Sequence, residues 1–264
     1  MMKNFFAFNK ASKIALLILV IFYVGFGIVI TLFQERLIYS PFSQDFDNCP
    51  ALSSADKIRF GATRAYYKEA GEKLVVLYHG NAGSACDRDY WALFFENNGY
   101  SYLIVEYEGY SNDGKTPSHN GIKGNVRDVI TFIESRQFKE VLVVGESIGS
   151  GPASLHASLL PPQKLLLFTA FSSLKDLAHS IYWYYPTSFM VNNAFDNVKS
   201  LKNFTGRVLI IHGENDTIIP QKLARTFFEN IDSDDKEFVS IAGANHNDIF
   251  IFKDTTIAIN NFLR

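Results

Sequence analysis

The chain has 264 residues, of which 47% are hydrophobic and 20% are charged, and its formal net charge is −2 at pH 7. Such a composition is that of an ordinary globular protein and excludes wholesale disorder, because it supplies enough apolar side chains for a core. It also excludes a nucleic-acid partner, since that class of protein normally carries a basic stripe and none is present here. The length fits one α/β domain of roughly 200–250 residues with a short extension.

The extension is an N-terminal apolar segment at residues 14–33, which contains no charged residue. A helix of this length spans the hydrocarbon core of roughly 30 Å, at a rise of about 1.5 Å per residue. We therefore predict a transmembrane helix over residues 14–33, within a membrane anchor at residues 1–36. A cleaved signal peptide is disfavoured because no small-residue cleavage site follows the apolar run, and a buried core helix is disfavoured because the run has no polar face.

The charges that flank this segment predict its orientation. Lys3, Lys10 and Lys13 precede it without any acidic residue, whereas Glu35 and Arg36 cancel each other after it. The positive-inside rule then places the N-terminus in the cytoplasm. The remaining chain is expected on the non-cytoplasmic side of the membrane, which is the periplasm if the source is bacterial.

After the anchor, strands and helices alternate, which predicts βαβ units and a mostly parallel sheet covered by helices. The run LVVLYHG at residues 74–80 is apolar in the manner of a strand that is buried on both faces. Strands are predicted at residues 58–60, 64–67, 74–80, 102–107, 141–145, 165–169, 208–212 and 238–241. Helices are predicted near residues 88–97, 121–136, 149–159, 221–230 and 248–262.

Cys49 and Cys86 are the only two cysteines of the chain. They lie in no C-x-x-C or Cys/His array, so they predict neither a zinc site nor a dithiol redox motif. The sequence neither requires nor excludes a disulfide between them.

A long irregular interval at residues 171–205 separates two of the predicted strands. It contains the aromatic run IYWYYP at residues 181–186. A segment of this length inside a compact α/β domain is often a lid or a binding element, so we predict a small lid-like insertion within a domain at residues 37–264. The alternative is that the aromatic rings only cover an apolar edge of the sheet.

The motif GESIG at residues 145–149 follows an apolar strand and precedes a stretch compatible with a helix. In that context G-x-S-x-G forms a sharp strand-to-helix turn that exposes the serine oxygen, and its glycines tolerate the crowding around the turn. Ser147 is therefore the candidate nucleophile. A serine hydroxyl needs a neighbouring base, and in this kind of site the partners follow in the order serine, acid, histidine.

Two later loops supply the predicted acid and base. His246 lies in the polar run GANHND after the last predicted strand, where an imidazole can reach the carboxyl edge of the sheet, so it is the predicted general base. Asp216 in HGENDTIIP is the predicted acid, which would orient the imidazole and fix its tautomer. Glu214 and Asp176 are the alternatives for the acid. We assign His212 a packing or loop-orienting role.

Hydrolysis of an acyl group also requires two fixed N–H donors for the oxyanion of the tetrahedral intermediate. One predicted donor is the backbone amide of Ile148, the residue after the nucleophile. The other is the backbone amide of Asn81 in HGNAG, with Ala82 as the alternative, because the glycines let this backbone approach the reacting atom. His79 in the same run is expected to buttress the loop.

With these residues, the chain resembles the α/β-hydrolase superfamily and, more narrowly, its Bem46-like group of membrane-associated serine hydrolases. The resemblance covers nearly the whole chain after the anchor and rests on ERLIYSP, HGNAGS, EYEGYSNDGKTPS, GESIGSG, FSSLKDLA, HGENDTIIP and NHND. It implies an eight-stranded α/β-hydrolase fold, a Ser147–Asp216–His246 triad, and hydrolysis of esters, thioesters or amides without a cofactor or metal. Since some relatives remove fatty acyl groups from proteins, acylated substrates are included. The chain departs from the group's Asp-Tyr-Arg-Gly in having EYEG, which places the acidic Glu108 near the expected mouth of the active site.

Two other functions fit parts of the sequence. The run GYSNDGKT at residues 109–116 matches the phosphate-binding pattern G-x-x-x-x-G-K-T, which would indicate a nucleotide hydrolase. Pro117 opposes the helix that this motif requires at Lys115. The second alternative is a scaffold or binding protein that kept the fold and lost catalysis, because a fold alone does not establish function.

Overall fold

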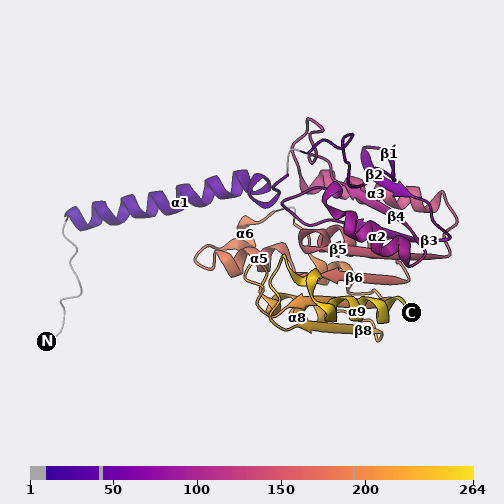
Figure 1. Ribbon diagram of the computed structural model, residues 1–264. Coiled ribbons are helices and arrows are strands. Elements are labelled where there is room, and N and C mark those ends of the chain that lie inside the picture. The colour runs from indigo at the N-terminus through magenta and orange to yellow at the C-terminus, as the bar shows by residue number, and fades with distance from the viewer. Residues whose placement is uncertain (1–9, 42–43, 193) are drawn as a thin grey trace.

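The computed structural model describes residues 10–41, 44–192 and 194–264, and within them eight strands form one sheet (Figure 1). The strand order is β1-β2-β4-β3-β5-β6-β7-β8; β2 pairs antiparallel with β1 and β4, and all other neighbours are parallel. Each strand predicted from the sequence is confirmed, with small shifts at its ends. The bounds are β1 (Asp56–Phe60), β2 (Thr63–Lys68), β3 (Lys73–Tyr78), β4 (Tyr100–Glu106), β5 (Glu140–Glu146), β6 (Lys164–Phe168), β7 (Arg207–Gly213) and β8 (Lys236–Ile241).

Helices cover both faces of the sheet, because the side chains of each strand alternate between the two faces. In β3, Leu74, Val76 and Tyr78 join one hydrophobic core, while Val75 and Leu77 join the other. Both cores are closed by helices that the sequence predicted. The first is covered by α3 (His119–Glu134), α4 (Ser150–Leu159) and α8 (Gln221–Glu229), and the second by α2 (Asp89–Asn97) and α9 (Lys253–Leu263).

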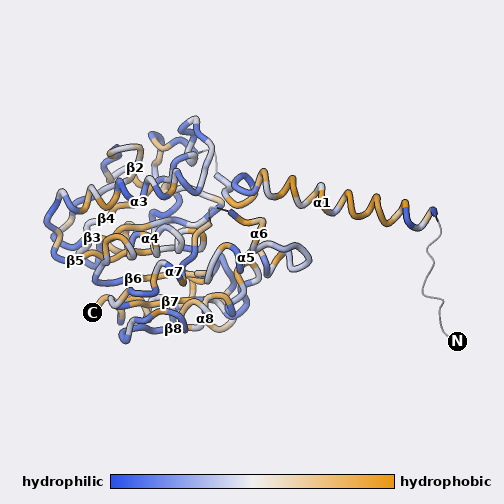
Figure 2. The backbone as a smooth tube through the Cα atoms, turned by 180° about the vertical axis from the view of Figure 1, so that it is seen from behind, coloured by the Kyte–Doolittle hydropathy of each residue, from blue (hydrophilic) through white to orange (hydrophobic). Residues whose placement is uncertain are grey.

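A single long helix, α1 (Lys10–Ile38), projects from the sheet domain (Figures 1 and 2). Its apolar side chains are largely exposed, and Gly27 is its only buried residue, all of this helix being described. By length and composition, α1 is able to cross a membrane. It extends beyond residues 14–33 at both ends, because the flanking residues include no glycine or proline.

The segment between β6 and β7 folds as three short helices, α5 (Leu174–Ile181), α6 (Thr187–Met190) and α7 (Asn197–Leu201), rather than as irregular chain. Side-chain caps start two of them: Ser173 accepts a hydrogen bond from the N–H of Asp176, and Asp196 accepts one from the N–H of Lys199. The alternative that the aromatic run only covers an edge of the sheet is wrong, since Trp183 is 73% exposed.

Cys49 and Cys86 form a disulfide, a pairing that the sequence left open. The bond joins the segment before β1 to the 3-10 turn η1 (Ala85–Arg88), which follows β3. It therefore restrains the chain just after the loop that contains Asn81.

Replacing both cysteines by serine is expected to lower the free energy of unfolding by about 3–4 kcal/mol, because the disulfide closes a loop with a sequence separation of 37 residues. Thermal unfolding of the full chain in detergent micelles, followed by circular dichroism, measures the change. A reductant should destabilise the unchanged chain by the same amount and leave the double variant unaffected. Equal stability of the variant and the unchanged chain would contradict this prediction.

Candidate active site

Ser147 lies at a sharp turn between β5 and the 3-10 turn η2 (Ser147–Gly149), which leads into α4. Its φ of 55° falls in the left-handed region, which is uncommon for a residue with a side chain. Glycine is required beside it, because a Cβ on Gly149 would lie 2.1 Å from the carbonyl oxygen of Tyr78, and one on Gly145 would lie 2.7 Å from the Cβ of Ala153. The serine is thus held at the carboxyl end of β5.

Ser147, His246 and Asp216 form one chain of hydrogen bonds. His246 Nε2 lies 2.9 Å from Ser147 Oγ, and His246 Nδ1 lies 2.8 Å from Asp216 Oδ2. Because a carboxylate can only accept, Nδ1 carries the proton and Nε2 accepts the hydrogen bond of the serine hydroxyl. Ser147 follows β5, Asp216 follows β7 and His246 follows β8. The carboxyl ends of these parallel strands share one edge of the sheet. This arrangement can activate the hydroxyl of Ser147 as a nucleophile.

The carboxyl group of Asp216 is buried and firmly held. The N–H groups of Ile218 and Ile219 donate to its Oδ1 at 2.9 and 2.8 Å, and His212 Nε2 lies 3.2 Å from its Oδ2. Burial raises the pKa of Asp216, but hydrogen bonds from His212 and His246 outweigh burial and hold that pKa well below its usual range. Asp216 is therefore a carboxylate at neutral pH. The loop-orienting role assigned to His212 includes the positioning of this carboxylate.

The two alternative acids bind other groups instead of His246. Glu214 accepts a hydrogen bond from Ser240 Oγ at 3.0 Å. Asp176 accepts one from Ser172 Oγ at 2.6 Å, at the start of α5. The geometry therefore favours Asp216 as the partner of the imidazole.

The predicted oxyanion donors line the same cavity as Ser147: Asn81, its alternative Ala82, and Ile148. Within the described part of the chain, the backbone N–H groups of Asn81 and Ala82 make no hydrogen bond to another protein group. The N–H of Ile148 belongs to the first turn of η2, where N–H groups lack a partner within the helix. These amides are thus available to a ligand next to Ser147.

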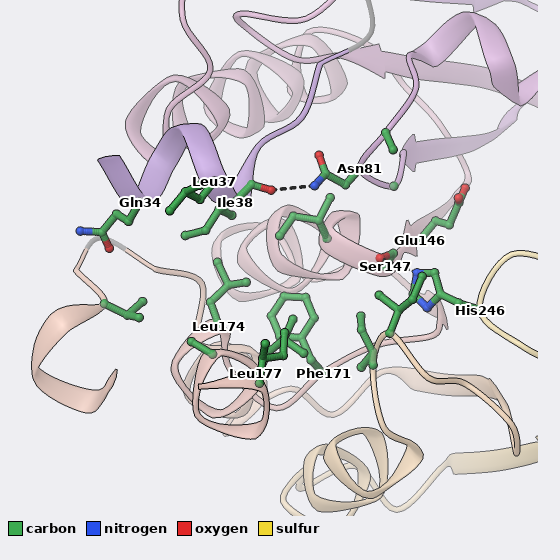
Figure 3. A pocket seen from close by; sticks show the side chains of 18 of the residues that line it. Gln34, Leu37, Ile38, Asn81, Glu146, Ser147, Phe171, Leu174, Leu177 and His246 are labelled. Atoms are coloured by element: carbon green, nitrogen blue, oxygen red, sulfur yellow. Dashed lines mark hydrogen bonds between the residues drawn. The ribbon is translucent and has the colours of Figure 1, made fainter. Parts of the chain in front are cut away.

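The side chain of Asn81 has a role that the sequence analysis missed. Its Nδ2 donates to the carbonyl of Ile38 at 2.6 Å (Figure 3), and its Oδ1 accepts hydrogen bonds from the N–H of Ser40 at 2.8 Å and the hydroxyl of Tyr110 at 2.9 Å. The end of α1 is therefore fixed to the loop after β3. Ile38 lies in ERLIYSP and Asn81 lies in HGNAGS, two runs that carried the family resemblance. Nothing in either run indicates that the two residues are in contact.

His79 buttresses the loop after β3, as expected. Its side chain is fully buried, and its ring stacks on that of Tyr107 with the centroids 4.1 Å apart. Its Nδ1 donates to the carbonyl of Gly80 at 2.7 Å, since a carbonyl can only accept.

The run at residues 109–116 does not form a phosphate-binding loop. Helix α3 begins at His119 rather than at Lys115, and Lys115 forms an ion pair with Glu108. Gly109 has φ 88°, and a Cβ there would lie 2.2 Å from the nitrogen of Pro117, so this glycine serves a tight turn. The nucleotide-hydrolase alternative is therefore wrong. Glu108 is not among the residues that line the cavity at Ser147.

A cavity of about 1010 Å³ extends from Ser147 and His246 to the end of α1 (Figure 3). In Figure 3, Ser147 and His246 lie on one side of it and Gln34 and Leu37 on the other. Its volume and its largely apolar walls suit a ligand with a long apolar chain. The apolar lining residues include Ile30, Leu37, Ile38, Ile148, Phe171, Leu174, Leu177, Ile181, Ile218, Ile219, Phe250 and Ile251.

An ion pair that the sequence analysis missed lies at the polar end of the cavity. Arg88 donates to the carboxylate of Glu146 through Nε at 2.7 Å and Nη2 at 2.9 Å, and both residues line the cavity. Glu146 occupies a variable position of G-x-S-x-G and Arg88 belongs to no motif, so no sequence signal marked either. Within the described residues, no group of three or more His, Cys, Asp or Glu side chains could hold a metal ion.

Comparisons with known proteins agree with this architecture, although no family model matches the chain. The sequence is 25% identical to an uncharacterised protein of Mycobacterium tuberculosis over 228 residues, which cover 81% of each chain. It is 28% identical to the lysophosphatidylserine lipase ABHD12 of Mus musculus over 204 residues, which cover 67% of this chain and 50% of that protein. The chain thus spans about half the length of the ABHD12 relatives.

Solved structures share the fold at lower sequence identity. An esterase of Pyrococcus furiosus superposes with a TM-score of 0.65 at 15% identity, covering 86% of this chain and 97% of that one. The esterase Est1E of Butyrivibrio proteoclasticus with bound ferulic acid gives a TM-score of 0.64 at 16% identity, covering 79% and 98%. The chain therefore has the α/β-hydrolase fold expected from its motifs, and its sequence is similar to that of the ABHD12 lipases.

Proposed function

We propose that this protein is a membrane-anchored serine hydrolase that cleaves a carboxylic ester, thioester or amide through an acyl-enzyme on Ser147. The observation that carries the proposal is the pair of hydrogen bonds on His246, at 2.9 Å to Ser147 and 2.8 Å to Asp216. Acyl transfer requires a nucleophile that is hydrogen-bonded to a base, which is in turn hydrogen-bonded to an acid. The names of the relatives, a lipase and esterases, agree with this reaction class.

In the proposed reaction, Ser147 Oγ attacks the acyl carbonyl while His246 Nε2 accepts the hydroxyl proton. The backbone N–H groups of Ile148 and Asn81 donate to the oxyanion of the tetrahedral intermediate. His246 then gives the proton to the leaving group, and the acyl-enzyme remains. A water molecule that loses its proton to His246 attacks this ester, releases the acid and restores Ser147. Asp216 stabilises the imidazolium form in both steps.

The proposed membrane topology places this site outside the cytoplasm. Lys10 and Lys13 precede the apolar part of α1, and basic residues favour the cytoplasmic side. The disulfide between Cys49 and Cys86 independently supports this orientation, because disulfides persist mainly in oxidising compartments. The proposed substrate is a small molecule or another molecule with an apolar acyl group, which the cavity at Ser147 would hold.

Labelling with a fluorophosphonate probe tests the proposed function. The unchanged full chain in detergent micelles is expected to be labelled, because the probe reacts only with an activated serine. The Ser147→Ala variant should give no signal at equal protein loading. A folded, unlabelled chain would support instead a catalytically silent scaffold or binding protein.

A further inference from the structure

An exposed aromatic surface lies beside α1. The tip segment, defined as residues 181–190, runs from the last residue of α5 to the end of α6 and projects from the sheet domain on the same side as α1 (Figures 1 and 2). Within it, Ile181 is 52%, Trp183 73% and Phe189 84% exposed. The sequence contains no Asp, Glu, Lys or Arg at residues 177–195. Large apolar surfaces of this kind mark contact with another apolar phase or partner.

The tip segment is attached to the apolar part of α1. Tyr23 donates its hydroxyl hydrogen bond to the carbonyl of Tyr184 at 2.6 Å, and Tyr185 donates in return to the carbonyl of Tyr23 at 3.2 Å. The rings of Tyr23 and Tyr185 stack with their centroids 4.5 Å apart. A Cβ on Gly27 would lie 3.1 Å from Tyr185 Cε1, so a side chain there would displace the Tyr185 ring by a few tenths of an ångström.

The position of this contact along α1 sets the depth of the tip segment. The uncharged run of α1 ends at Phe33, and Tyr23 precedes it by about ten residues, which is about 15 Å along the helix axis. The hydrocarbon core is only roughly 30 Å thick. A membrane that covers the uncharged run must therefore also cover the tip segment that contacts Tyr23.

Part of the backbone of the tip segment is paired internally, which reduces the cost of an environment where unpaired N–H groups are unfavourable. The N–H of Tyr182 donates to Ala178, that of Tyr185 to Tyr182, and that of Phe189 to Pro186. These hydrogen bonds form within the segment and its own helices, so they do not require water.

The cavity at Ser147 reaches the same region. Ile30, Thr31 and Gln34 of α1 line it, and so do Tyr182 and Met190 of the tip segment. Its far wall is therefore built by the two elements that would border the lipid. An apolar chain in that part of the cavity would lie next to the acyl chains of the membrane.

We infer that the tip segment lies in the non-cytoplasmic leaflet of the membrane crossed by α1, and that the cavity opens into that leaflet. The substrate is then an acyl lipid resident in the bilayer, which reaches Ser147 without passing through water. This inference deepens the proposed function and rests on its membrane anchor. The partner of the tip segment is the lipid bilayer.

Tryptophan fluorescence tests the depth, because the chain has two tryptophans, buried Trp91 and exposed Trp183. The full chain is reconstituted in phosphatidylcholine vesicles whose acyl chains are brominated or unmodified. In Trp91→Phe, brominated lipids are expected to quench the emission of Trp183, because the inferred depth places this side chain beside the acyl chains that carry the bromine. The difference between the unchanged chain and Trp183→Phe gives the same quantity without altering Trp91. Quenching by acrylamide in water, with no effect of brominated lipids, would overturn the inference.

Hydrolysis in two phases tests the route of the substrate. In Trp183→Lys/Phe189→Lys, the rate on a long-chain acyl ester within vesicles should fall about tenfold or more, because lysine is costly in a membrane. The rate on dissolved p-nitrophenyl acetate should stay unchanged, since neither residue lines the cavity. The matched control is Leu93→Lys, which alters a residue that is 62% exposed on α2 and away from the tip segment. If the double variant hydrolyses both substrates as fast as the unchanged chain does, the inference is overturned.

The two proposals fail in different ways. If the proposed function is wrong, the unchanged chain in vesicles will not react with the fluorophosphonate probe, whatever the fluorescence of Trp183. If only the present inference is wrong, Ser147 will be labelled and p-nitrophenyl acetate will be hydrolysed while Trp183 is quenched from the water phase.

Discussion

Replacing Ser147 by alanine is expected to lower kcat for a p-nitrophenyl ester by a factor of about 10⁴–10⁶, because the atom that forms the acyl-enzyme is lost. His246 would then face a methyl group, and water would have to attack the carbonyl without covalent catalysis. The KM should change little, since the walls of the cavity remain. Steady-state kinetics of the purified full chain in detergent micelles, with initial rates over a range of ester concentrations, measures both quantities.

Ser158→Ala provides the matched control for this experiment. Ser158 is exposed on α4, the helix that follows the nucleophile, and its hydroxyl donates only to the carbonyl of Leu155 at 2.7 Å. This variant should keep the full rate. If Ser147→Ala instead retains more than about a tenth of the activity, another residue is the nucleophile, since the loss expected for a serine triad is far larger.

The centre of the sheet was predictable because its strands are short apolar runs between turn residues, as β3 and β5 illustrate. The parallel order follows from the alternation with helices, and it brings the loops after β5, β7 and β8 to one edge. The positions of Ser147, Asp216 and His246 could therefore be predicted without coordinates. Each follows a strand that the sequence marks clearly.

Contacts between distant segments were not predictable in the same way. The link from Asn81 to Ile38 and the ion pair of Arg88 with Glu146 join parts of the chain with no shared period or spacing. The ion pair of Glu108 with Lys115 is a further contact that no sequence pattern indicated. The helices of the insertion were missed because they are only 8, 4 and 5 residues long, too short to show a helical period in the sequence.

Replacing Asp216 by asparagine is expected to lower kcat by about 10⁴, because an amide neither fixes the Nδ1–H tautomer of His246 nor balances the charge of its imidazolium form. Asp176→Asn is the control, since Asp176 carries the same functional group and bonds to Ser172 instead. This variant should keep most of its activity in the same ester assay. An inactive Asp176→Asn beside an active Asp216→Asn would assign the acid to Asp176 at the start of α5.

The pH dependence of stability tests the electrostatic state of Asp216 separately from catalysis. Because its pKa in the folded chain lies well below the usual range, the carboxylate contributes stability that is fully present above the unfolded pKa of about 3.9. That contribution is lost as the pH falls toward the folded pKa. The difference in unfolding free energy between the unchanged chain and Asp216→Asn should therefore be constant near pH 7 and shrink below about pH 4.

Urea unfolding of both chains, near pH 7 and below about pH 4, measures this difference. A difference that grew on acidification would show that burial, rather than the hydrogen bonds from His212 and His246, dominates the pKa, and the acid could then not support the imidazolium.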